Sequence, residues 1–205
     1  MQSVTAQRTT WVVSVVLAFA LVSILVYRGS YAALSATTTN PGNTWSAFGI
    51  TLTDNRNGTA LFTSSDMLPG DSESKCILVT YEGSTPPDAV RLYVTDVTGT
   101  DSVSGTGELT DELDVSIHSD ADSDGATDCS TFDSTDEVQA ATALSTMPTG
   151  YAGGVELDPA ASTDWTPDDG ESRAFKVTVS LPIDAALDVQ GDSASATFTW
   201  EAQKS

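Results

Sequence analysis

Several stretches of the chain alternate apolar and polar residues, and this pattern limits the fold more than any other feature of the sequence. Alternation at every second residue gives a strand one buried face and one solvent face, as in an antiparallel sheet. The stretches are FGITLTD from Phe48, KCILVTY from Lys75, AVRLYVTDV from Ala89, LDVSIH from Leu113, FKVTVSL from Phe175 and SATFTWEA from Ser195. Ser, Thr, Gly, Asp and Pro fill the gaps, as turns require. The sequence therefore predicts an all-β fold, a sandwich of two antiparallel sheets.

Helical signal is weak and is strongest in the stretch STDEVQAATAL. Ser134 is a suitable N-cap and Glu137 follows three residues later, which is the spacing of a capping box. Val138, Ala141 and Leu144 would then share one face of the helix. We therefore expect one or two short helices, with this one packed on the edge of the sandwich.

Residues 1–33 have the pattern of a secretory signal. Trp11 to Tyr27 is apolar except for two serines, a basic residue precedes it, and small residues follow. We expect a hydrophobic signal helix that is cut near Ala32, Ala33 and Leu34. The alternative is an anchor that stays in the membrane, although a run of this length is barely enough to span a bilayer. Both interpretations place the rest of the chain beyond the cytoplasmic membrane.

Without that leader, residues 34–205 suit one domain with a sizeable core. The full chain has 8 basic and 29 acidic residues, and loss of Arg8 and Arg28 leaves a net charge of 6 − 29 = −23. Such a surface repels phosphate backbones and anionic lipid, so we expect no nucleic-acid partner. The acidity suits solubility, cation binding or a salty medium.

The chain has two cysteines, Cys76 and Cys129. Two cysteines in a chain with a secretory leader favour one disulfide. In the chain-entropy model, closing a loop of this size stabilises the fold by about 4 kcal/mol. The alternative is a pair of buried free thiols.

Two stretches of the sequence repeat each other. DMLPGDSESK from Asp66 and DWTPDDGESR from Asp164 share aspartate, proline, glutamate, serine and a basic residue at equal offsets, and each leads into a predicted strand. They are either two equivalent ligand loops or two equivalent corners of the sandwich. Turn chemistry explains every shared residue, so we favour the corners.

The stretch SDADSDGATDCSTFD is the one candidate metal site. Its alternating aspartates and its glycine match the oxygen ligands and the sharp bend of a calcium-binding loop, although Thr131 stands where a bidentate glutamate is usual. The candidate ligands are Asp120, Asp122, Asp124, Asp128 and Asp133. The alternative is a solvated acidic loop in a protein that is acidic throughout. We expect no required cofactor, with Ca²⁺ as the one candidate.

Catalytic motifs are not found in the sequence. His118 is the single histidine, so a His-Glu-x-x-His zinc site cannot form, and a Ser-His-Asp site would have to use this residue. No Gly-rich phosphate loop follows a strand. Trp45, Trp165 and Trp200 suit either a sugar-binding platform or, as we favour, the core. We therefore expect a protein that is not an enzyme, and a secreted hydrolase is the weakest alternative.

Three segments carry a resemblance to a known family. They are the leader exit YAALSATTTNPGNTWSAFGITLTD, the turn SSDMLPGDSESKCILVTYEG and the closing LPIDAALDVQGDSASATFTWEA. In this order they resemble the TasA/camelysin family of secreted bacterial proteins. The resemblance implies a jelly-roll-like sandwich and a dedicated signal peptidase that cuts near Ala32-Ala33. It also implies a role in the protein fibres of biofilm matrix, in which the freed N-terminal strand inserts into the neighbouring subunit.

In this chain the donor strand would lie in the N-terminal arm 34–44. Its residues would be Leu34, Ser35, Ala36, Thr37, Thr38 and Thr39. The segment is uncharged and rich in β-branched threonine, so it can pair as a strand without bringing charge into a core. Donor and acceptor would be different surfaces, so the contact would be head-to-tail and would grow a filament. The alternatives are a floppy tail and a strand that pairs within its own subunit.

The function expected from the sequence is a structural subunit, secreted to the cell surface or the extracellular matrix. Its partners would be further copies of itself, other matrix or cell-surface proteins, and the signal peptidase during export. The second hypothesis is a monomeric, calcium-dependent surface adhesin. Because copies with this charge repel each other at low salt, we expect assembly to need salt or divalent cations.

Overall fold

The computed structural model describes residues 34–40, 50–64, 67–102, 108–122, 128–133, 136–158 and 163–204. Residues Leu34–Lys204 form one compact unit. The predicted signal helix and the cleavage residues Ala32 and Ala33 lie outside the described residues, as do Trp45 and Asp124. Within the described ranges, no helix has the length and hydropathy to cross a membrane.

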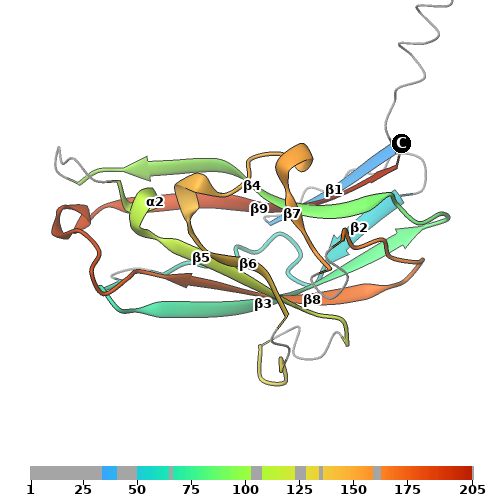
Figure 1. Ribbon diagram of the computed structural model, residues 1–205, viewed down its shortest axis with the longest axis horizontal. Helices are drawn as coiled ribbons and strands as arrows, with labels where there is room; N and C mark the ends of the chain where they lie inside the picture. The colour runs from blue at the N-terminus through green and yellow to red at the C-terminus, as the bar shows by residue number, and fades with distance from the viewer. Residues whose placement is uncertain are drawn as a thin grey trace, which may run out of the picture. The chain divides into compact units, whose positions relative to one another are not determined.

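Two antiparallel sheets build this unit, as the alternating pattern predicts (Figure 1). The first sheet has the order β1 (Leu34–Asn40), β9 (Ser193–Lys204), β4 (Ala89–Thr100) and β7 (Val155–Glu156). The second has the order β2 (Ile50–Asp54), β3 (Ser72–Gly83), β8 (Ser172–Ser180), β5 (Asp114–Asp120) and β6 (Asp136–Ala143). The helical elements are short: α2 (Leu109–Glu112), η1 (Leu144–Thr146), η2 (Tyr151–Gly153) and η3 (Leu187–Val189). The predicted all-β class with two sheets is confirmed.

The core lies between the two sheets. Phe175 of β8 contacts Trp200 of β9 with ring centroids 5.7 Å apart, and Trp165 packs edge-on against Phe175 at 6.1 Å. Trp165 and Trp200 are 2% and 1% exposed, so both belong to the core and neither forms a sugar platform. The inward positions of each alternating stretch supply the rest of the buried cluster.

The turns before β3 and β8 are equivalent corners. In each, the N–H of the fourth residue donates to the carbonyl of the first, from Asp71 to Leu68 at 2.9 Å and from Glu171 to Asp168 at 3.0 Å. The acidic side chain of the fourth residue accepts the N–H of the first, at 2.8 Å in the turn of Asp71 and at 3.0 Å in that of Glu171. Because these groups are satisfied within the turns, the structure supports the corner interpretation.

The third residue of each turn is a glycine in the left-handed region. Gly70 has φ 97° and Gly170 has φ 79°, a conformation that costs other residues free energy. These two glycines lie 170 − 70 = 100 positions apart, whereas the sequence echo pairs Asp66 with Asp164, 98 positions apart. The alignment of the two turns by structure therefore differs by two residues from their alignment by sequence.

The stretch that the sequence predicted as a helix is a strand. Asp136–Ala143 forms β6, which pairs with β5 at the edge of the second sheet. The single helical turn η1 begins only at Leu144, and the proposed N-cap Ser134 lies outside the described residues. The helix prediction was wrong.

Bulges in the β5–β6 ladder explain why this strand has a helix-like pattern. The register shifts twice between residues 115 and 118 of β5, and each shift places one extra residue in β6. Half-buried side chains therefore recur along β6 at 138–139 and again at 142–143, four residues apart. That spacing is close to one turn of an α-helix, whereas an unbulged strand would repeat every two residues.

Candidate functional site

The segment expected to be a donor strand is β1, and it pairs with β9 of its own chain. The ladder runs from Leu34 opposite Lys204 to Asn40 opposite Phe198 (Figure 1). The stretch LSATTTN is therefore not a floppy tail in the single chain. It pairs within its own subunit, which was one of the alternatives left open by the sequence.

β1 covers only part of β9. Its ladder ends opposite Phe198, and the preceding residues 193–197 of β9 have a described strand partner only on the β4 side. The outer backbone edge of 193–197 thus lacks a strand neighbour in the described part of the chain. Such an edge is a template for another chain.

An apolar groove of about 880 Å³ opens beside this edge. Side chains from both sheets and from the β2–β3 connection line it. They include Leu61, Phe62, Met67, Leu113, Val115, Leu144, Val179, Leu181, Ala194, Ala196 and Phe198. The groove therefore lies beside the part of β9 that has no outer strand neighbour within the described residues.

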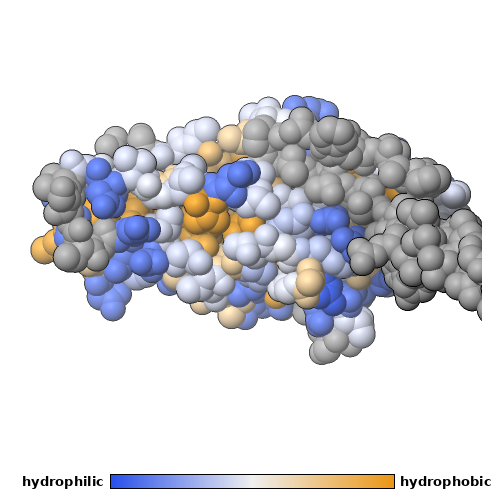
Figure 2. Space-filling view, turned by 90° about the horizontal axis from the view of Figure 1, so that it is seen from above, coloured by the Kyte–Doolittle hydropathy of each residue, from blue (hydrophilic) through white to orange (hydrophobic). Residues whose placement is uncertain are grey.

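Large apolar side chains are exposed close to the groove. Leu68 and Leu187 line it and are 64% and 86% exposed. Ile183 is 79% exposed and lies next to Gly70. Figure 2 shows apolar side chains among the mostly polar surface of the face seen from above. Exposed apolar surface of this kind often marks an interaction site.

One buried acceptor in the groove wall has no partner. Asp192, just before β9, accepts the N–H of Ser102 through Oδ1 at 2.7 Å, while its buried Oδ2 has no hydrogen-bond partner. An N–H from an added chain would satisfy this oxygen. Neither the groove nor Asp192 was predicted, although Ile183 and Leu187 stand out as apolar residues in a loop sequence.

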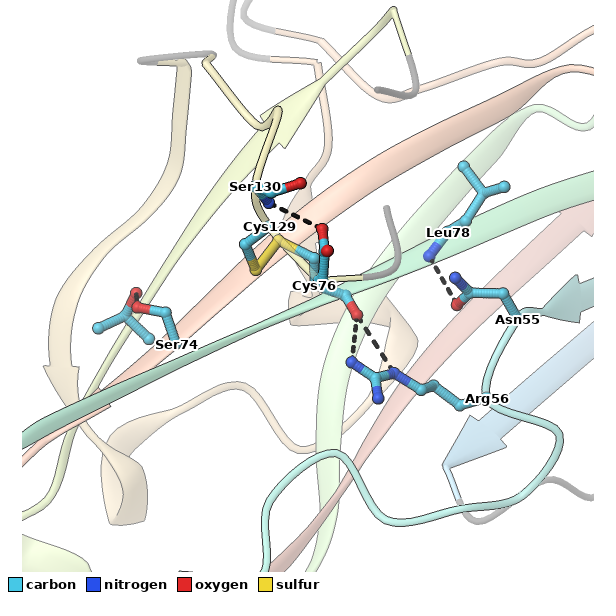
Figure 3. Close-up of a disulfide and its surroundings, with 9 residues drawn as sticks. Asn55, Arg56, Ser74, Cys76, Leu78, Cys129 and Ser130 are labelled. Atoms are coloured by element: carbon cyan, nitrogen blue, oxygen red, sulfur yellow. Dashed lines mark hydrogen bonds between the residues drawn. A yellow bond between two sulfur atoms is a disulfide. The ribbon is translucent and has the colours of Figure 1, made fainter. Parts of the chain in front are cut away.

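The facing edge of the second sheet is capped by side chains. Beyond β2, the guanidinium of Arg56 donates to the carbonyl oxygen of Cys76 from Nε at 3.2 Å and from Nη2 at 2.7 Å (Figure 3). The amide oxygen of Asn55 accepts the N–H of Leu78 at 3.0 Å. These contacts block strand addition at this part of β3.

The predicted disulfide is present and ties the acidic loop to β3. Cys76 and Cys129 are bonded, with Cα atoms 5.3 Å apart (Figure 3). Next to it, Lys176 of β8 places its Nζ 5.7 Å from the centroid of the Phe132 ring. The alternative of two free thiols is wrong.

The candidate calcium ligands are only partly brought together. Asp120 ends β5 and is 5% exposed, while Asp122, Asp128 and Asp133 are exposed. Hydrogen bonds from Ser130 lower the pKa of Asp128, and the N–H of Ser130 lies 2.9 Å from its Oδ1. Within the described ranges, no three His, Cys, Asp or Glu side chains form a ready-made metal cluster.

His118 lies in β5, between β8 on one side and the bulged ladder to β6 on the other. It is opposite Lys176 of β8 and Glu137 of β6, and it is half-buried. No hydrogen bond in the described part of the chain joins it to a serine, so the structure offers no support for a Ser-His-Asp site. The expectation that the protein is not an enzyme stays a prediction.

The chain matches no protein-family model and no curated protein.

Proposed function

We propose that this protein is a secreted structural subunit of cell-surface or matrix fibres, and that its copies join by exchanging β1. One observation carries the proposal: β1 is an uncharged strand that lies at a sheet edge and starts where the leader is expected to be cut. A strand held by one ladder can leave its own β9 and form the same ladder on another copy. The TasA/camelysin resemblance supports the same assembly.

The direction of β1 favours head-to-tail growth. An incoming β1 in the register of the single chain would start opposite Lys204 and end opposite Phe198. The body of the subunit that supplies it would then lie on the groove side of β9. There, the exposed Leu68, Ile183 and Leu187 would be buried against it. The donor and acceptor surfaces are different, so the contacts continue from copy to copy.

Mixed single-cysteine variants test the exchange directly. Ser35 and Gln203 are ladder partners, so a Ser35→Cys protein is mixed with a Gln203→Cys protein, both starting at Leu34 and both assembled in salt. Because the two new thiols are on different chains, a disulfide between them requires β1 of one copy on β9 of another. We expect a covalent heterodimer on a non-reducing gel and fibres by electron microscopy.

Matched variants make the outcome specific. Ala152→Cys places an exposed thiol in η2, which precedes β7 at the opposite edge of the first sheet, and should give no cross-link with Ser35→Cys. A chain carrying both Ser35→Cys and Gln203→Cys should lock β1 to itself, stay monomeric when oxidised, and assemble after reduction at a concentration that spares the native disulfide. Deletion of Leu34–Asn40 should likewise abolish fibres.

Fibres formed by the locked chain, or by the deletion protein, would contradict the proposal. Monomers in every salt and calcium condition would also contradict it. They would favour the second candidate, a monomeric surface-binding module, which agrees with the self-paired β1 of the single chain.

A further inference from the structure

The last residue of β5 carries a carboxylate in an unusual environment. Asp120 lies opposite Ala174 of β8 and is 5% exposed. Ala174 itself is 0% exposed, so this end of the sheet is covered. The disulfide at Cys129 fixes the chain that follows β5 to the neighbouring part of the sheet at Cys76.

The hydrogen bonds of Asp120 are incomplete. Its Oδ1 accepts the N–H of Asp122 at 3.0 Å, which orients the carboxylate toward the turn that opens the acidic loop. Its Oδ2 is buried and has no hydrogen-bond partner. An ionised carboxylate can accept about four hydrogen bonds, and a buried oxygen without any is costly.

Asp120 forms no ion pair within the described part of the chain. The four ion pairs found there involve other residues. The ammonium of Lys176 lies over the ring of Phe132 instead. Asp122 and Asp128, which follow Asp120 in the sequence, add negative charge to the same loop. A buried carboxylate oxygen without a partner, in a loop that carries further negative charge, is a candidate ligand for a bound cation.

We propose that Asp120 is the anchor of a divalent-cation site and that Ca²⁺ occupies it outside the cell. The Oδ2 of Asp120 supplies a buried oxygen ligand, the carboxylate of Asp122 supplies a second, and water completes the shell. Calcium accepts such mixed oxygen ligands in flexible geometry, and sites with few carboxylates in extracellular proteins bind in the millimolar range. Within the described ranges, no group of three His, Cys, Asp or Glu side chains could hold a metal ion, so the site relies on two carboxylates and water.

Thermal unfolding of the intact, disulfide-bonded mature protein tests this site. The protein is stripped with a chelator and then titrated with CaCl₂ at constant, high NaCl, so that general screening does not change. We expect a saturable rise of Tm with half-saturation in the millimolar range. Calorimetric titration of the same protein should show one site. MgCl₂ at the same concentrations should raise Tm less, because Mg²⁺ demands stricter geometry.

Two substitutions and a matched control assign the response to this carboxylate. Asp120→Asn should abolish the saturable rise, and without calcium it should be at least as stable as the parent because the uncompensated charge is gone. Asp122→Asn changes an exposed side chain, so it should fold normally and raise the half-saturating calcium concentration about tenfold. Asp184→Asn removes one exposed charge from a turn in another part of the chain and should leave the calcium response unchanged.

A parent protein whose Tm does not depend on calcium would overturn the proposal. An Asp120→Asn protein that keeps the full saturable response would also overturn it. If Asp120→Asn fails to fold, the proposal would be overturned by an Asp122→Asn protein whose Tm responds to calcium as the parent does. Fibre assembly is not needed for any of these measurements, so they are independent of strand exchange.

Discussion

Single residues join parts of the chain whose partnership no local pattern reveals. Arg91 of β4 donates from Nε and Nη2 to the two carboxylate oxygens of Asp164, both at 2.9 Å, and lies 5.7 Å from the centroid of the Tyr151 ring. The sequence placed Arg91 on the polar side of a strand, and it placed Asp164 in a repeated turn motif. Their pairing could not be predicted because it spans 73 positions and depends on how the segment after β7 returns to the sheet.

Tyr93 should control part of the alkaline stability. Burial, together with the 2.6 Å hydrogen bond that its hydroxyl donates to Glu201, raises the pKa of Tyr93 above its ordinary value. A raised folded-state pKa gives stability that is complete below the unfolded pKa of about 10 and is lost as the pH rises above it. We expect Tyr93→Phe to cost about 1–2 kcal/mol at pH 7. It should also make the fall of stability above pH 10 shallower.

Urea unfolding of both proteins between pH 7 and pH 11 measures this effect. Some alkaline loss remains in the variant, because burial also raises the pKa of Tyr81 and of Tyr151. Curves for Tyr93→Phe and the parent that run parallel across this range would contradict the assignment.

At the scale of elements, sequence periodicity predicted strands well where the ladder is regular. It failed for β6, where bulges stretch the repeat of half-buried positions from two residues to four. The two turn motifs were predicted as corners, but the residues that fix the corners are Gly70 and Gly170. These glycines are 100 positions apart, whereas the matching residues of the sequence repeat are 98 positions apart. The two turns are equivalent because their glycines share a positive φ, and a backbone angle cannot be read directly from the sequence.

Alanine substitutions in these turns should separate backbone strain from loss of flexibility. Gly70→Ala and Gly170→Ala force a side chain into positive φ, and each should destabilise the fold by about 1 kcal/mol. Gly150 has φ −167° and open space around its Cα, so Gly150→Ala should be neutral or slightly stabilising. Chemical denaturation of the three variants provides the comparison, and equal losses at all three positions would contradict the role of the turns.

At the scale of the whole molecule, some properties could be predicted from the sequence and the groove beside β9 could not. The sequence supplied the charge, the all-β class and the disulfide, which are properties of composition and of short patterns. The groove beside β9 could not be predicted in the same way, because it depends on which side chains of the two sheets and of the β2–β3 connection come together there.

Assembly of the protein that starts at Leu34 should depend strongly on salt. With a net charge of 6 − 29 = −23, approaching copies repel each other, and this repulsion reaches about 30 Å at 0.01 M salt but only about 3 Å at 1 M. We expect the sedimentable fraction to rise steadily with NaCl over this range, while sucrose at matched osmolarity has no such effect. Faster assembly at the lowest salt would contradict a charge-limited encounter.

The ladder between β1 and β9 also has a kinetic consequence. A copy whose N-terminal strand is docked on its own sheet can neither give that strand away nor accept another in its place until the seven paired residues separate. This opening involves one molecule, so its rate does not depend on how many copies surround it. If copies exchange β1 as proposed, elongation would stop accelerating above a certain subunit concentration and proceed at the opening rate, and each copy would stay monomeric for a fixed average time.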